Sequence, residues 1–218
     1  MPYCYGVPTL TERRHQQIRA EIAEAAIGLF ADRGFDAVTM DDVAEASGAS
    51  RRTVYRHFST KGDLMFERPR GWVRHFAEVV ADRHPGDSGL DRCVRGLRSV
   101  ARCIDATDEA VFVGFQVYLQ TPSLRGTHAR LDDEVFSHIS ALAAEDLPDD
   151  EDKVTETAVL AGALVGTLNG VLAAWAMQWP DKTMVELMDH ALERVRPVLT
   201  GDGSRGFSSG STSAEVSR

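Results

Sequence analysis

Four cations and several hydroxyl groups are concentrated in residues 46–62, which read ASGASRRTVYRHFSTKG. The segment contains no acidic residue, although the chain as a whole has a formal net charge of -9. Arginine can donate two hydrogen bonds to the acceptor edge of guanine, whereas lysine, hydroxyl and imidazole groups bind phosphates. These residue types together predict contact with double-stranded DNA.

A helix over residues 51–58 would separate the cationic side chains from the apolar ones. Val54 and Phe58 are one turn apart and would face the protein interior. At about 100° per residue, Arg52 and Arg56 would then point roughly 160° and 200° away from Val54. The exposed face of this helix is therefore predicted to present two arginines flanked by hydroxyl groups, and an α-helix fits the major groove.

Capping residues predict the elements that hold this helix in place. Thr39 is expected to cap a helix that ends before Gly48, and Ser50 is expected to cap the next one. Two short helices joined by a glycine-containing turn form a helix-turn-helix. A longer helix is expected to begin at Thr11 and to end at Gly34, because its apolar residues recur at three- and four-residue steps.

Composition limits the remaining possibilities. Residues 1–75 carry a charge balance of +1 and residues 76–218 a balance of -10, so only the first third suits a polyanion. The N-terminus has no apolar segment typical of a secretory signal, which predicts a cytoplasmic location. The three cysteines are too scattered for a zinc site, and we expect neither a metal nor a cofactor. No phosphate loop, nucleophile elbow or HExxH motif is present, so an enzyme is the less favoured alternative.

Residues 18–65, IRAEIAEAAIGLFADRGFDAVTMDDVAEASGASRRTVYRHFSTKGDLM, resemble the DNA-binding head of the tetracycline-repressor (TetR) family. The resemblance implies an all-α fold with a three-helix head, a helical ligand-binding and dimerisation domain, and a homodimer. We expect the head at residues 11–66 and the second domain at residues 67–200. The Gly/Ser-rich residues 201–218 are predicted to be a disordered tail.

The resemblance also assigns roles in DNA binding by position. It implies phosphate contacts from the start of the second helix and from the hydroxyl, imidazole and ammonium groups of the third helix region, whereas the arginines stand where family members vary with the operator. The predicted DNA-binding residues are Thr39, Ser50, Arg51, Arg52, Thr53, Tyr55, Arg56, His57 and Lys61, with base contacts assigned to the three arginines.

An uncharged run occupies residues 157–180 and is long enough to span a bilayer, which needs about 20 apolar residues. Polar side chains interrupt the run, and no cluster of Lys or Arg flanks it as an orientation signal. A helix that is apolar on all sides is otherwise a buried one, so we predict a helix within a protein rather than a membrane anchor.

The same run is a candidate dimer interface. Gly162, Gly166 and Gly170 recur at four-residue steps, which lets another helix approach closely. We expect helices at about 153–179 and 182–199 to form half of a four-helix interface across a two-fold axis. An intramolecular core is the alternative use of these residues.

Aromatic residues between the head and the predicted interface are the candidates for an effector pocket, with an ordinary core as the alternative. The predicted ligand-binding residues are Trp72, Phe76, Phe112, Phe115, Tyr118 and Trp175. They favour a small, largely apolar effector. Residues 117–131 also resemble family members thought to bind acyl-CoA-like molecules. The resemblance implies a repressor that the effector releases from a palindromic operator, and the sequence itself leaves activation open as the alternative.

Overall fold

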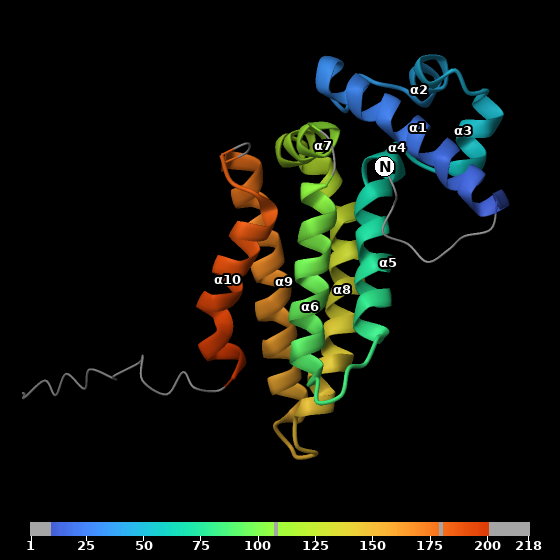
Figure 1. Cartoon of the computed structure of the whole chain (residues 1–218). Helices are drawn as coiled ribbons and strands as arrows, with labels where there is room; N and C mark the ends of the chain where they lie inside the picture. The colour runs from blue at the N-terminus through green and yellow to red at the C-terminus, as the bar shows by residue number, and fades with distance from the viewer. Residues whose placement is uncertain (1–9, 107–108, 179–180, 201–218) are drawn as a thin grey trace, which may run out of the picture.

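The computed structural model describes residues 10–106, 109–178 and 181–200, and the predicted tail at 201–218 lies outside these ranges. All regular elements within the described ranges are helical, which confirms the predicted all-α class (Figure 1). The elements are α1 (Leu10–Arg33), α2 (Met40–Ser47), α3 (Arg51–His57), α4 (Lys61–Met65), α5 (Glu67–Ala81), α6 (Gly89–Asp105), α7 (Glu109–Gln120), the 3-10 turn η1 (Pro122–Leu124), α8 (Arg125–Asp146), α9 (Lys153–Gln178) and α10 (Met184–Leu199).

The helices α1, α2 and α3 form the head, and local signals set most of their ends. Helix α1 begins at Leu10, so Thr11 lies inside it and the predicted cap at Thr11 is wrong. Gly34 follows α1 with φ of 80°, a left-handed conformation that glycine adopts without steric cost. The predicted caps of α2 at Thr39 and of α3 at Ser50 are confirmed, because each side chain accepts a hydrogen bond from a backbone N–H of the first turn.

The helical path is interrupted between α4, which ends at Met65, and α5, which begins at Glu67. Phe66 separates the two helices with φ of -102° and ψ of 15°. Thr60 and Asp63 form a capping box that starts α4 only one turn earlier. Pro69 lies in the first turn of α5, where a backbone N–H has no intrahelical partner to lose. The short helix α4 connects the head to α5, the first helix of the bundle.

The helices α5, α6, α8, α9 and α10 run side by side below the head, and α7 lies at the end of this bundle nearest the head (Figure 1). One hydrophobic cluster fills the bundle and a second fills the head. The head cluster also contains Val117, Leu124 and Leu131, which come from α7, η1 and α8. The head therefore packs directly on the bundle, and the division at residue 66 stays a prediction.

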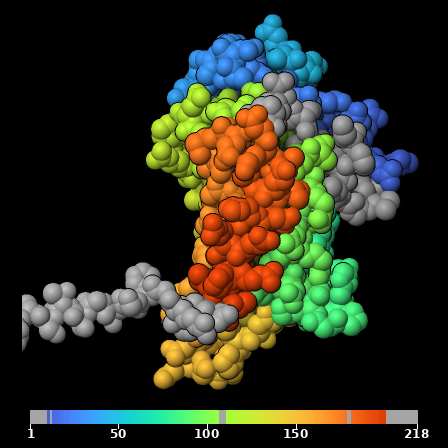
Figure 2. All heavy atoms as spheres, turned by 60° about the vertical axis from the view of Figure 1, so that its left-hand side comes forward, coloured from blue at the N-terminus to red at the C-terminus, as the bar shows by residue number. Residues whose placement is uncertain are grey.

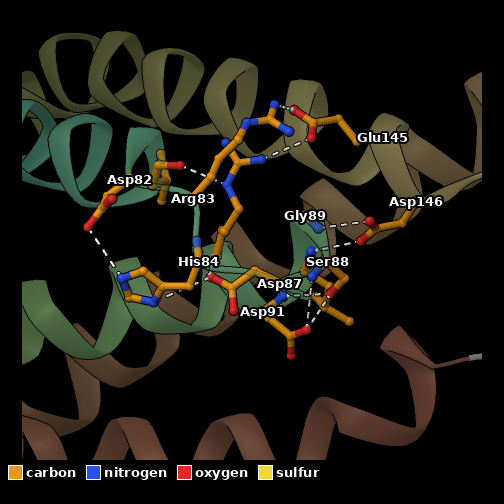
Figure 3. Close-up of polar contacts among 12 residues, drawn as sticks. Asp82, Arg83, His84, Asp87, Ser88, Gly89, Asp91, Glu145 and Asp146 are labelled. Atoms are coloured by element: carbon orange, nitrogen blue, oxygen red, sulfur yellow. Dashed lines mark hydrogen bonds and ion pairs between the residues drawn. The ribbon is translucent and has the colours of Figure 1, made fainter.

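A polar network fixes the end of the bundle opposite to the head (Figure 3). The carboxylate of Asp146 accepts hydrogen bonds from the backbone N–H groups of Gly89, at 2.7 Å, and Leu90, at 2.8 Å, and so caps α6 from α8. Arg92 is 5% exposed and pairs with Glu145 at 2.9 Å. A buried charge of this kind is stable only when it is paired, so the network holds α6 and α8 in register.

Candidate nucleic-acid interface and ligand cavity

Helix α3 presents a polar face on a firmly anchored base. Val54 is 0% exposed and Phe58 is 1% exposed, which confirms their predicted burial in the head. Arg52, Tyr55 and Arg56 are exposed on the other side of the helix. Within the described ranges, neither of these two arginines forms an ion pair with a carboxylate. Their guanidinium groups are therefore available to an external acceptor.

Arg51 lies differently from the other two arginines. Its guanidinium pairs with the carboxylate of Asp41 in the first turn of α2. The two side chains are 70% and 44% exposed, and an exposed pair contributes only about 0–1 kcal/mol. A DNA phosphate or base could replace Asp41 at little cost, so base reading by Arg51 stays a prediction that requires this side chain to turn outward.

The hydroxyl groups predicted to bind phosphates also cap helices. Thr39 Oγ1 lies 2.6 Å from a carboxylate oxygen of Asp42, and these hydrogen bonds hold the pKa of Asp42 below its usual value. The Thr39 hydroxyl proton is therefore already donated. Ser50 Oγ and Thr53 Oγ1 lie 2.8 Å apart and share one hydrogen bond, so one of their two hydroxyl protons is left to donate to a phosphate.

His57 lies at the end of α3, where its ring meets the ring of His15 edge-on at a centroid distance of 5.5 Å. Burial, and then the charges of Arg56 and Arg19, lower the pKa of His57 below its ordinary value. The imidazole is therefore uncharged at neutral pH. It can donate a hydrogen bond to a phosphate, but it contributes no charge to the interface.

Lys61 is directed toward the protein itself. Its Nζ donates to the carbonyl oxygens of Phe35, at 2.5 Å, Asp36, at 3.2 Å, and Val38, at 2.9 Å. The ammonium also lies 4.4 Å from the centroid of the Phe35 ring. Its three donors are thus used by the turn between α1 and α2, and a phosphate contact would have to displace one of these carbonyls.

We expect Lys61→Met to destabilise the head more than it alters the electrostatics of DNA binding. Three carbonyls would lose a charged donor, which costs about 1–3 kcal/mol of unfolding free energy. Thermal unfolding would show a lower midpoint, and the salt dependence of DNA affinity would stay as in the wild type. Lys153→Met removes a surface charge as a control. If the slope of log DNA affinity against log salt concentration fell by about one counterion while the stability stayed unchanged, Lys61 would instead be a phosphate contact.

A cavity of about 80 Å3 lies directly beneath the head. Ile27 of α1, Met65 of α4 and Phe66 reach it from the head side, and side chains of α5 to α9 close it from below. Four of the predicted ligand-binding residues line this cavity: Trp72, Phe76, Phe115 and Tyr118. The Trp72 and Phe115 rings stack at 6.4 Å with an interplanar angle of 9° and form one apolar wall.

Phe112 and Trp175 are not among the residues that line the cavity, so the prediction that Trp175 closes it needs correction. The two rings meet edge-on at 5.9 Å, and Trp175 also packs against Phe115 at 6.1 Å. Residues at three-residue steps turn by about 60° each around a helix, so Phe112 and Tyr118 cannot face the same point. Phe112 and Trp175 therefore lie behind the cavity wall, where Trp175 packs against Phe115.

Sequence reasoning missed the polar side of the cavity. His128, Asp132 and Asn169 line it together with Tyr118. His128 and Asp132 are one helical turn apart, a spacing that signals an interacting pair. Asn169 is a polar residue within the uncharged run, which forms all but the first turn of α9. The pattern alone did not reveal that α8 and α9 bring these groups to one cavity.

Comparison with known proteins supports this geometry. Residues 22–67 match the family model described as bacterial regulatory proteins, tetR family. The chain is 31% identical over 118 residues to a putative mycofactocin biosynthesis transcriptional regulator, MftR, of Mycobacterium tuberculosis. That match covers 52% of this chain and 57% of MftR, so it spans little more than half of the relative.

Two further similarities extend over most of the chain. The chain is 23% identical to the HTH-type transcriptional regulator TcmR of Streptomyces glaucescens, with 91% of each protein covered. The transcriptional regulator FadR of Bacillus subtilis, solved in complex with stearoyl-CoA, superimposes with a TM-score of 0.61 at 16% identity. This superposition covers 83% of this chain and 97% of FadR, and at such low identity it shows a shared fold. The helix-turn-helix head at residues 22–67 therefore belongs to the tetR family of bacterial regulatory proteins, and the helical bundle beneath it shares the fold of FadR.

Proposed function

We propose that the protein is a repressor that binds a palindromic DNA operator as a homodimer and is released by a small, largely apolar effector. The observation that carries this proposal is the exposed face of α3, where Arg52 and Arg56 project without a carboxylate partner in the described part of the chain. Arginines on a helix held by buried residues at its back can read base edges in the major groove. We propose a cytoplasmic location and no enzymatic activity.

The open face of α9 and α10 is the proposed dimer interface, and Figure 2 shows the two helices side by side on it. Helix α9 is long and apolar enough to cross a membrane by length and composition. Only 22% of its most apolar 18-residue segment is buried inside the chain. Met177 is 75% exposed and Val198 is 54% exposed. A partner copy would cover this apolar surface and set the spacing of the two α3 helices.

The cavity is the proposed effector site, and its size favours a compact molecule. Drug-sized ligands occupy pockets of about 300–1,000 Å3, whereas this cavity measures about 80 Å3. The long acyl chain of a stearoyl-CoA, which FadR binds, would require the walls to move apart. An acyl-CoA-like effector is therefore the less favoured alternative.

Release from DNA would follow from the shared wall between cavity and head. Met65 and Phe66 line the cavity and also belong to the hydrophobic cluster of the head. An effector that pushes these side chains would favour a head orientation other than the DNA-bound one. By linkage, each kcal/mol by which the effector binds that state more tightly than the DNA-bound state weakens operator binding by the same free energy.

Selection of bound duplexes from a random DNA pool tests the proposal. A dimeric regulator is expected to recover a palindrome whose half-sites are about one helical turn, or a multiple of it, apart. Recovery of no preferred sequence, or of an asymmetric site bound by one chain, would contradict the proposed function.

We expect Arg52→Ala to cost about 1–3 kcal/mol of specific operator binding and to relax the preference at one base pair. The affinity is measured by fluorescence anisotropy on the selected operator and on duplexes substituted at each position. Arg83→Ala, at the opposite end of the bundle, removes the same charge as a control. Equal weakening on every sequence would reassign Arg52 to phosphate binding.

A further inference from the structure

One wall of the cavity is polar and is assembled from three helices. Tyr118 comes from α7, His128 and Asp132 come from α8, and Asn169 comes from α9. Asn169 Nδ2 donates to one carboxylate oxygen of Asp132 at 3.1 Å, and His128 Nδ1 lies 3.1 Å from the other. Most of the other lining side chains are apolar, so this wall is where a ligand's polar group would be recognised.

The protonation state of Asp132 determines which ring nitrogen of His128 carries a hydrogen. Burial alone would raise the pKa of Asp132, but the hydrogen bonds from His128 and Asn169 hold it below its usual value. Asp132 is therefore ionised at neutral pH and only accepts hydrogen bonds, so His128 carries a hydrogen on Nδ1. In the neutral imidazole, Nε2 is then an acceptor, and it has no hydrogen-bond partner among the described residues.

Tyr118 supplies the second feature of the wall. Its ring stacks on the imidazole of His128 at a centroid distance of 4.7 Å and an interplanar angle of 22°. Burial, and then the negative charge of Asp132, raise the pKa of Tyr118, so its phenol stays protonated. The stacked ring and the contact of Nδ1 with Asp132 together restrict the orientation of the imidazole and therefore the position of Nε2.

The size of the cavity limits the rest of the ligand. A cavity needs roughly 10–15 Å3 to hold one water molecule, so about 80 Å3 has room for roughly five to eight heavy atoms, the size of one ring with a small substituent. Burying an ionised ligand in largely apolar surroundings is costly unless a partner is free, and both oxygens of Asp132 are already bonded. A neutral hydrogen-bond donor therefore fits the wall better than an ammonium or a carboxylate group.

We propose that the effector is a compact, uncharged ring compound that donates a hydroxyl hydrogen to Nε2 of His128, with Asp132 and Asn169 as positioning residues. This inference rests on the proposed repressor function for its regulatory meaning. The ligand preference itself is a property of the cavity and can be measured without DNA.

Direct titration of the full chain with phenol and toluene tests the proposal, because the two differ mainly in the hydroxyl group. Phenol is expected to bind about tenfold more tightly than toluene. Phenol, and not toluene, is also expected to shift the 15N resonance of His128 Nε2, a readout on the wild type that no folding defect can mimic. Equal affinities, or an unshifted Nε2 resonance at saturation with phenol, would overturn the proposal.

Two charged analogues separate the alternatives. Tighter binding of benzylamine than of phenol would make Asp132 a direct partner for a cation, and tighter binding of benzoate would point to Arg68 on the cavity lining. Either result overturns the hydroxyl assignment. Weaker binding of both analogues than of phenol is the expected outcome.

His128→Phe keeps a flat ring against Tyr118 and removes the acceptor. We expect it to reduce phenol binding to the level of toluene while toluene binding is retained. Val100→Ala changes the apolar lining as a control and should alter the affinities of phenol and toluene alike. A phenol preference that survives His128→Phe would contradict the assignment. Failure of the DNA selection would remove the repressor proposal and leave these binding results standing.

Discussion

Gly166→Leu is expected to convert the assembled protein into folded monomers. A Cβ atom added at Gly162, Gly166 or Gly170 would meet nothing within 4 Å, so the chain itself has room for a larger residue. In the proposed dimer the same face of α9 lies against a partner helix. Overpacking costs about 1–3 kcal/mol per site, and two-fold symmetry doubles it to a total of about 2–6 kcal/mol.

Sedimentation velocity measures the outcome directly. We expect the mutant to sediment at the monomer mass at concentrations where the wild type is a dimer, with its helical circular dichroism unchanged. Gly126→Leu places the same side chain at another open helical glycine, on α8, and should leave the assembly intact. A Gly166→Leu protein that still sediments as a dimer would remove the glycine row from the interface.

The structure of the head could be predicted from sequence because its signals are local. Thr39 and Ser50 cap helices through residues only three positions away, and Val54 and Phe58 are one turn apart. Such signals depend on neighbouring residues and not on the tertiary fold. The exposure of Arg52 follows from the same helical geometry.

The contacts that could not be predicted join residues far apart in the chain. The ammonium of Lys61 binds carbonyls 23 to 26 positions earlier, and nothing in the local pattern distinguishes this from a phosphate contact. Asn169 and Asp132 are 37 positions apart and meet only because α8 and α9 pack together. The cavity therefore became visible as a polar site only in three dimensions.

The contact between Arg19 and Glu67 is also long-range, and it connects the head to the bundle. The Arg19 guanidinium binds both carboxylate oxygens of Glu67, with Nε at 2.8 Å from Oε1. Its Nη1 donates to the carbonyl of His57 at the end of α3, at 2.6 Å, and the group lies 4.5 Å from the Phe58 ring centroid. Glu67 follows Phe66 of the cavity wall directly, so movement of that wall would disturb the support of α3.

We therefore expect Arg19→Met to weaken operator binding at least about tenfold, which corresponds to about 1.4 kcal/mol. Unfolding free energy should also fall by roughly 2 kcal/mol, because Glu67, 13% exposed, would lose its partner. Anisotropy on the selected operator and chemical denaturation measure the two effects. Gln17→Met, on the same helix, removes only an exposed hydrogen bond to Glu21 and is the control.

A double variant separates positioning from stability. Arg19→Met with Glu67→Leu replaces the ion pair by apolar side chains, which commonly restores stability because no unpaired charge remains. The carbonyl of His57 would still lack its donor, so operator affinity is expected to stay low while the unfolding free energy recovers. Recovery of both quantities together would show that Arg19 acts only through the stability of the fold. A persistent loss of affinity at wild-type stability is the result expected if one guanidinium sets the position of α3 relative to the bundle.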